Sequence, residues 1–238
     1  MSNNQIIEDL IKKALTKLQA VYPGDSQKDK PCQTKDLDIS PLSFPKIYND
    51  KKKKGLPRVS EQEIRFLLTE ELSNKRHVYP FHYSVETPTQ LAYKFSDKGK
   101  KLSPPEVTKD GQSANVDVCL YADSSLENLK VNKKYYIEFK GANVLKEEIT
   151  KDFLKLLHDG NGPENYFVHI IESCDSGTRS NIEDKYKWAI NIVDYPFFSQ
   201  LTIYLYFIKA NELYKYTVNK KGGKGPILCL DKNAPFSL

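Results

Sequence analysis

The stretch KYYIEFKGA (residues 134–142) decides the fold, because it has the pattern of a β-strand with an acid and a base among apolar side chains. Successive side chains of a strand point to opposite faces. One face then carries Tyr135, Ile137 and Phe139, and the other carries Tyr136, Glu138 and Lys140. Glu138 and Lys140 should lie about 6 to 7 Å apart along one surface. A charge inside an apolar strand is costly unless it is paired or bound to a metal ion, so both are expected to have partners.

A second strand, SANVDVCLYA (113–122), repeats the pattern. Val116, Val118 and Leu120 are expected to face one way, and Asp117, Cys119 and Tyr121 the other. If the two strands are neighbours, Asp117 meets Glu138 and Lys140 on one face. Two carboxylates there suit Mg²⁺ or Mn²⁺, which takes one or two carboxylates together with water and substrate phosphate. A lysine beside such an ion can orient the attacking water and help to deprotonate it.

The rest of the chain predicts an α/β sheet covered by helices. Ser60 and Glu63 have the form of a capping box that begins a helix ending near Ser73. From periodicity, helices are also predicted at 3–20, 146–160 and 181–193, and strands at 77–89, 165–173, 201–209, 212–218 and 226–230. The polar segment 94–113 is expected to hold a further short strand and a loop. Residues 22–58 contain five prolines and read as a linker or an extended arm. The predicted division is therefore an amphipathic helix with a Pro/Lys-rich arm (1–58) and a main domain (59–238).

The spacing of Asp117, twenty intervening residues and then Glu138-Phe139-Lys140 resembles the PD-(D/E)XK nuclease superfamily. The resemblance covers residues 60–175, and Val116 stands where the family often has proline. It implies a restriction-endonuclease-like or Holliday junction resolvase-like fold, with a central mixed β-sheet flanked by helices. It also implies an endonuclease or other hydrolase that cleaves phosphodiester bonds with Mg²⁺ or Mn²⁺, with DNA as the expected substrate. The segments SEQEIRFLL, YSVETPT and IEFKGAN also look like a group of bacterial proteins assigned to this fold.

The resemblance also implies roles for particular residues. Asp117 and Glu138, with the carbonyl of Phe139, would hold one or two metal ions, and Lys140 would position and activate water. The family carries a glutamate on the helix before the first strand. Glu61 is the choice for this position, because helical geometry places it on the apolar stripe of its helix. Glu71 falls on the same stripe and is its rival, and a first-turn glutamate favoured by the helix dipole is the alternative for Glu61.

Other charged residues near the motif allow two interpretations each. Glu86 in the strand YSVETPT could add a metal ligand, although a surface or structural role is favoured. Lys151, Asp152 and Lys155 follow the motif on a helix, where a solvated face is favoured over contact between the lysines and phosphate. Lys51 to Lys54 read as a solvated linker or as an arm that contacts phosphate.

The composition is that of a globular cytoplasmic protein. With 36 basic and 31 acidic residues, the net charge of +5 is compatible with a nucleic-acid partner. No apolar run approaches the roughly 20 residues that cross a bilayer, and the N-terminus lacks the features of a secretory signal. No pair among the four cysteines has the close spacing of a thiolate zinc site.

Two alternatives to an autonomous nuclease stay open. One is a catalytically inactive module on the same fold that binds nucleic acid or another protein. The other is a nuclease subunit that works only with a partner. The amphipathic first helix is the expected face for such a partner or for a homodimer.

Overall fold

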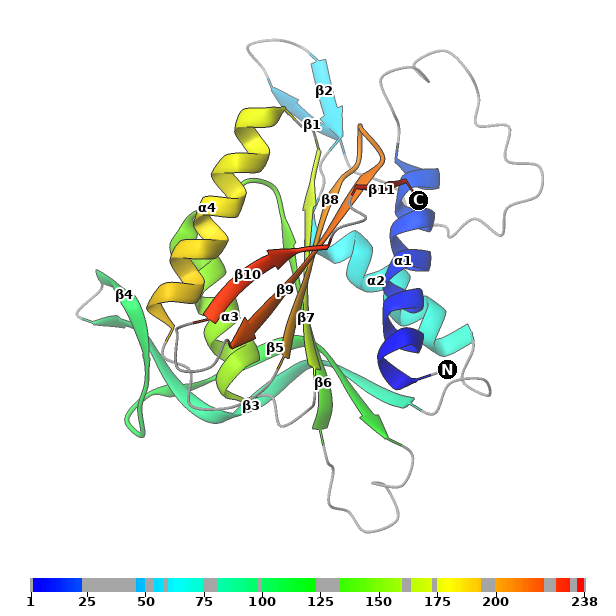
Figure 1. Ribbon diagram of the computed structural model, residues 1–238. Helices are drawn as coiled ribbons and strands as arrows, with labels where there is room; N and C mark the ends of the chain where they lie inside the picture. The colour runs from blue at the N-terminus through cyan, green and yellow to red at the C-terminus, as the bar shows by residue number, and fades with distance from the viewer. Residues whose placement is uncertain are drawn as a thin grey trace.

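The computed structural model describes twelve ranges of the chain: 2–22, 46–49, 54–57, 60–74, 81–97, 100–122, 133–159, 164–172, 175–193, 200–220, 226–231 and 235–237. Within them the chain forms an α/β fold around a mixed sheet (Figure 1). Lys51 to Lys53 and most of the predicted linker lie outside the described residues.

The main sheet has the strand order β10-β9-β8-β7-β6-β5-β3-β4, with the short β11 beside β9. Its strands are β3 (Phe81–Asp97), β4 (Lys100–Val107), β5 (Gln112–Ala122), β6 (Lys133–Gly141), β7 (Glu164–Ile171), β8 (Gln200–Phe207), β9 (Glu212–Lys220), β10 (Pro226–Leu230) and β11 (Phe236–Ser237). The β6–β7 and β7–β8 pairs are parallel, whereas β5 is antiparallel to both β3 and β6. The two strands that carry the motif, β5 and β6, are therefore neighbours, as expected.

Four helices of the described chain cover the sheet in two layers (Figure 1). Helices α1 (Asn3–Val21) and α2 (Glu61–Asn74) pack on one face, and α3 (Lys146–His158) and α4 (Ser176–Ile192) pack on the other. The predicted capping box at the start of α2 is confirmed in part, because the Ser60 hydroxyl accepts from the N–H of Gln62. Glu63 accepts hydrogen bonds from both the backbone N–H and the hydroxyl of Ser60. This contact explains why Glu63 is buried although it lies off the apolar stripe.

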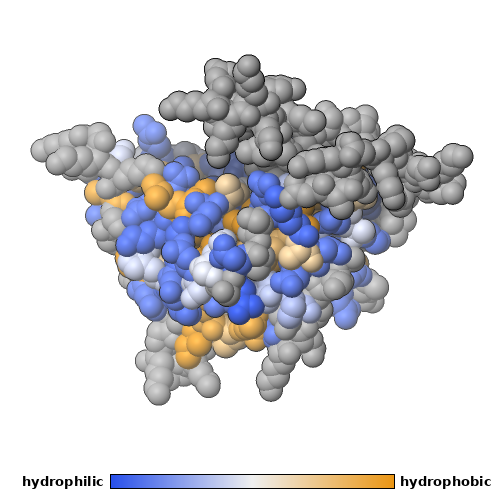
Figure 2. Space-filling model, turned by 90° about the horizontal axis from the view of Figure 1, so that it is seen from above, coloured by the Kyte–Doolittle hydropathy of each residue, from blue (hydrophilic) through white to orange (hydrophobic). Residues whose placement is uncertain are grey.

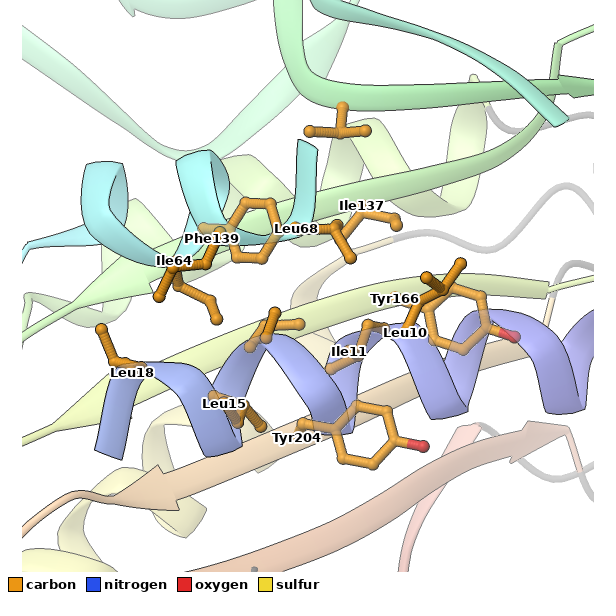
Figure 3. Close-up of a cluster of buried hydrophobic side chains, with 14 of the residues drawn as sticks. Leu10, Ile11, Leu15, Leu18, Ile64, Leu68, Ile137, Phe139, Tyr166 and Tyr204 are labelled. Atoms are coloured by element: carbon orange, nitrogen blue, oxygen red, sulfur yellow. The ribbon is translucent and has the colours of Figure 1, made fainter. Parts of the chain in front are cut away.

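The apolar face of α1 is part of the core (Figure 3). Its Leu10, Ile11, Leu15 and Leu18 are almost completely buried. They pack with Ile64 and Leu68 of α2 and with Ile137, Phe139, Tyr166 and Tyr204 of the sheet. The face that was expected to bind a partner or a second copy is thus used inside the chain. A dimer or partner contact through the N-terminal helix stays a prediction, and any such contact has to use the other side of α1.

Two parts of the structure differ from the sequence-based prediction. Residues 46–49 and 54–57, within the predicted linker, form an antiparallel pair of strands, β1 (Lys46–Asn49) and β2 (Lys54–Pro57). Strand β3 runs on to Asp97 and pairs with β4, where a short strand and a loop were expected. Residues 94–107 are polar and contain two prolines, so strand propensity does not predict this extension, which depends on pairing with the neighbouring strand.

The alternation in β5 is confirmed except at one position. Val118 and Leu120 pack with α1 and α2, while Cys119 and Tyr121 pack with α3 and α4. Val116, which was expected beside Val118, instead belongs to the α3–α4 core. The strand pairing is irregular close by, since Glu86, between the partners of Val116 and Val118, has a φ of 49°. The alternation rule assumes regular pleating and fails at this distortion.

On the face seen from above, the described surface is mainly hydrophilic, with smaller hydrophobic areas between the polar ones (Figure 2). No helix in the described ranges is long and apolar enough to cross a membrane.

Candidate active site

One hydrogen bond joins the two motif strands. The backbone N–H of Phe139 donates to Oδ2 of Asp117 over 2.8 Å, so Asp117 is fixed opposite the middle of Glu138-Phe139-Lys140. Phe139 contacts Asp117 through its amide, while its ring packs in the α1–α2 core. Burial is the main cause that raises the pKa of Asp117, and the charge of Asp152 adds to it; the Phe139 hydrogen bond, Lys155 and Arg65 act in the opposite direction.

The carboxylate of Glu138 points to the α3 side of the sheet and meets Lys155 of that helix. Glu138, Asp152 and Lys155 are 2%, 3% and 4% exposed, so these charges are buried together. Lys155 Nζ also lies 3.1 Å from Asp152 and donates to the backbone carbonyl of Asn115 over 2.9 Å. Burial, followed by the charges of Asp152 and Asp117, raises the pKa of Glu138 well above its ordinary value, although Lys155 opposes the shift.

Lys140 is held by the same helix. Its Nζ lies 2.8 Å from Oδ2 of Asp152 and 4.0 Å from Oε2 of Glu61. Burial would lower the pKa of Lys140, but Asp152, Glu61 and Glu138 outweigh it and raise the pKa above its ordinary value. Burial likewise opposes ionisation of Asp152, but Lys155 and Lys140 hold its pKa below the ordinary value. Lys140 is therefore an ammonium in this arrangement, which suits it to donate to water or phosphate.

Glu61 lies over the end of β6, beside the charged cluster. We use this name for Asp117, Glu138, Lys140, Asp152 and Lys155. A Cβ on Gly141 would lie 3.0 Å from the backbone nitrogen of Glu61, so the start of α2 packs directly on this glycine. Burial is the largest cause that raises the pKa of Glu61; Lys140 lowers it, and Asp117 and Asp152 raise it. The rival, Glu71, lies elsewhere: it pairs with Lys17 of α1 over 2.7 Å. Ten residues along a helix, about 15 Å, separate it from Glu61, so Glu71 has a structural contact with α1.

Glu86 joins the cluster through a residue that sequence reasoning missed. Arg65, one turn after Glu61 on α2, contacts the carboxylate of Glu86 and lies 3.5 Å from Oδ1 of Asp117. The left-handed φ of Glu86 is uncommon for a residue with a side chain, and such conformations persist where surrounding contacts hold them. Glu86 is thus a partner of Arg65 rather than a direct neighbour of the Glu138 carboxylate.

Sequence reasoning also misplaced Asp152 and Lys155, which were expected on a solvated helix face. Asp152 could have been found, because it stands three residues after Ile149 and four before Leu156, next to the apolar stripe. Lys155 had no such signal. It is buried because it contacts Glu138 of β6 and the Asn115 carbonyl of β5, and those contacts depend on the fold.

The donor set is compatible with a divalent cation, by two observations. Asp117 and Glu138 supply two acidic groups that lie close enough for the charge of Asp117 to raise the pKa of Glu138, and Mg²⁺ needs only one or two carboxylates because water and phosphate supply the rest. Glu138 Oε1 is a buried carboxylate oxygen whose described contact is the ion pair with Lys155. In the described ranges, no three His, Cys, Asp or Glu side chains already form a metal-binding group. An ion would therefore compete with Lys155 for Glu138 and with Arg65 for Asp117.

Comparisons of the chain with protein-family models, with curated proteins and with solved structures gave no match. The interpretation of the cluster consequently depends on its own geometry and chemistry.

Proposed function

We propose that this chain is a metal-dependent nuclease of the PD-(D/E)XK type with a restriction-endonuclease-like fold. The observation that carries the proposal is the hydrogen bond from the Phe139 amide to Asp117, which holds the Asp117 carboxylate beside the Glu138-Phe139-Lys140 segment of the adjacent strand. The order α2, β3, β4, β5, β6, α3, β7 supports it, because it follows the helix, strands, helix and strand that the resemblance implies.

In this proposal, Asp117 and Glu138 hold one or two Mg²⁺ or Mn²⁺ ions, with the Phe139 carbonyl and Glu61 as further oxygen donors. When bound, such an ion stabilises negative charge on the scissile phosphate and lowers the pKa of water. Lys140 donates hydrogen bonds to the attacking water or to a phosphate oxygen. Asp152 keeps the Lys140 ammonium in place, since its carboxylate lies 2.8 Å from Nζ.

The test is a digest of plasmid DNA, single-stranded DNA and RNA by the purified full-length chain, with Mg²⁺, Mn²⁺ or EDTA. We expect cleavage that EDTA abolishes. Lys140→Ala and Asp117→Asn should each reduce the rate about 100-fold or more, because each removes a group that acts on water or metal. Lys187→Ala, purified in the same way, is the matched control, because this exposed lysine pairs only with its neighbour Asp184 among the described contacts. Cleavage in EDTA, or a wild-type rate from Lys140→Ala, would contradict the proposal.

A second candidate function has one observation in its favour. Each acid of the cluster already contacts a cation of the chain: Glu138 meets Lys155, Asp152 meets both lysines, and Asp117 meets Arg65. Such internal neutralisation would suit a catalytically inactive module that binds nucleic acid or a partner protein. Nucleic-acid binding without cleavage under any of the metal conditions above would favour this function. Cleavage that appears only after a second protein is added would favour a nuclease subunit.

A further inference from the structure

Strands β3 and β4 form an arm that leans over α3. We define the β3–β4 arm as residues 91–97 and 100–110. Asp159, at the end of α3, ties the base of the arm to the sheet: its Oδ1 accepts from the Leu91 N–H over 2.6 Å, and its Oδ2 accepts from the Tyr136 hydroxyl of β6 over 2.7 Å. Tyr93 is 2% exposed, so this part of the arm belongs to the core. In Figure 1, β4 stands beside α3, at the far end of the long β3.

Two cavities open between this arm and α3. The larger has a volume of about 600 Å³ and reaches Lys155, and the smaller, of about 290 Å³, reaches Lys140 and Asp152. Phe95, Ser96 and Lys151 line both cavities. Both cavities therefore reach the charged cluster, and these three residues form a wall that separates one cavity from the other.

The shared wall consists of an aromatic ring and a cation. Lys151 Nζ lies 4.7 Å from the centre of the Phe95 ring, and the ring stacks with Tyr93 at 5.7 Å between centroids and 7° between planes. Phe95 is only partly buried and Lys151 is exposed. An aromatic ring beside a lysine has the chemistry of a nucleotide site, because a base can stack on the ring while the ammonium contacts phosphate.

Charge distinguishes the two cavities. The larger one is lined by Lys94, Lys151 and Lys155 against Glu86 and Asp110. In the smaller one, Glu147, Glu148 and Asp152 outnumber Lys140 and Lys151. A phosphate chain is consequently better placed in the larger cavity.

Size then limits the form of the nucleic acid. A cavity of about 600 Å³ has the volume of a small-molecule site and accommodates one or two nucleotides, whereas a base-paired duplex is too wide for it. We propose that the larger cavity binds an unpaired strand of nucleic acid, with a base stacked at Phe95 in place of the Lys151 ammonium and a phosphate at Lys151. This inference rests on the proposed nuclease function, and it makes single-stranded or forked nucleic acid the preferred substrate.

The test measures binding of fluorescent oligonucleotides to the full-length protein in EDTA, so that cleavage cannot interfere. The probes are a 12-nucleotide DNA, the RNA of the same sequence, a blunt DNA duplex and a forked duplex. We expect the unpaired or forked probes to bind about tenfold more tightly than the blunt duplex, and the DNA and RNA arms show which sugar is preferred. A blunt duplex that binds as tightly as the single strand overturns the inference.

Substitutions at Phe95 test the stacking platform. Phe95→Leu keeps an apolar side chain without an aromatic face and should weaken single-strand binding about tenfold, whereas Phe95→Tyr should restore it. Phe66→Leu, at another aromatic residue that is 58% exposed on α2, is the matched control and should leave binding unchanged. Equal affinities of Phe95→Leu and the wild type overturn the inference, as does equal weakening by Phe66→Leu.

The two proposals fail in different ways. A protein that binds the single strand in EDTA but cleaves nothing with Mg²⁺ refutes the nuclease function and supports the unpaired-strand site. A protein that cleaves blunt duplex and single strand at the same rate supports the nuclease function and refutes the site. Absence of binding to all four probes overturns the site as well.

Discussion

Asp152 Oδ2 on helix α3 lies 2.8 Å from Nζ of Lys140 on strand β6. The lysine of the Glu-x-Lys motif is therefore held by a helix that packs on the sheet, more closely than by Glu61 at 4.0 Å. Asp152 also lies 3.1 Å from Lys155, which contacts Glu138. One buried aspartate thus fixes both lysines of the candidate active site.

Removal of this aspartate's charge should destabilise the protein. Asp152→Asn leaves two buried ammonium groups with one acid fewer, and loss of one member of a buried ion pair costs about 3 to 5 kcal/mol. Urea unfolding followed by circular dichroism would measure the loss. Asp184→Asn is the matched control, since Asp184 also pairs with a lysine three residues later, Lys187, but both of these side chains are exposed to solvent. The control should change the unfolding free energy by less than about 1 kcal/mol. Equal effects of the two substitutions would contradict the buried role of Asp152.

Lys155→Met tests whether Glu138 can hold a metal ion. The substitution removes the ammonium that contacts the buried Glu138 carboxylate, so a divalent cation no longer has a competitor there. Excess Mn²⁺ should therefore raise the unfolding temperature of Lys155→Met by several degrees more than that of the wild type, by linkage between binding and folding. The double variant Glu138→Gln/Lys155→Met lacks the carboxylate and should lose this additional response. The same Mn²⁺ response in all three proteins would argue against Glu138 as a ligand.

Much of the motif region could be predicted from the sequence, because it depends on local rules. The alternation in β6 placed Glu138 and Lys140 on one face, and the two motif strands are indeed adjacent. The common face of Glu138 and Lys140 was predictable because successive side chains of a regular strand alternate between the two faces of the sheet. The same rule failed at Val116, where the pairing beside Glu86 is distorted.

The remainder depends on contacts between distant parts of the chain. Lys155 looked like a surface lysine, and its burial depends on contacts with Glu138 of β6 and the Asn115 carbonyl of β5, which are distant in the sequence. Arg65 meets Asp117 across 52 positions of sequence, and no periodicity encodes that meeting. The packing partner of the apolar face of α1 was equally unpredictable, since amphipathicity predicts that a face is buried but does not identify the surface that covers it.

Helix α1 should be required for stability of the single chain. Leu10 of α1 is fully buried against α2 and the sheet, so Leu10→Ala should lower the unfolding free energy by about 2 to 5 kcal/mol. Thr16→Ala, on the exposed side of the same helix, should cost less than about 1 kcal/mol. Urea unfolding of both variants checks the difference. If Leu10→Ala left stability unchanged, α1 would not be docked as described.

His169 should make stability depend on pH. It is fully buried on β7, where its ring nitrogens contact the Tyr186 hydroxyl at 2.8 Å and the Ala142 carbonyl at 2.7 Å. Burial is the main cause that lowers the pKa of His169 to about 4, and the charges of Lys140 and Lys185 lower it further. The hydrogen bond to the Ala142 carbonyl and the charge of Asp152 act in the opposite direction. Between pH 6.5 and 4 the unfolded chain therefore binds a proton that the folded chain does not. This histidine contributes stability that is present above pH 6.5 and lost as the pH falls, about 3 kcal/mol in total.

Unfolding free energies of the wild type and His169→Asn at pH 7 and pH 5 would measure this contribution. The wild type should lose more stability than the variant between the two values, because asparagine does not titrate. Identical losses would show that other groups cause the pH dependence.

Gly111 should be required for the β3–β4 arm. A Cβ at this position would lie 2.6 Å from the backbone carbon and oxygen of Tyr93, a clash with main chain that no side-chain movement relieves. Gly111→Ala should therefore displace the base of the arm, and hydrogen exchange should increase at residues 91–97 and 108–113. Gly177→Ala is the matched control, since its Cβ would meet a side-chain oxygen of Asp175 at 3.3 Å and would not clash with the main chain. Because that position is in the first turn of α4, alanine should leave stability unchanged or raise it by about 0.4 to 1 kcal/mol. If Gly111→Ala showed the exchange pattern of the wild type, Gly111 would not pack against the Tyr93 backbone as the structure has it, and the wall of the larger cavity would have to be assigned differently.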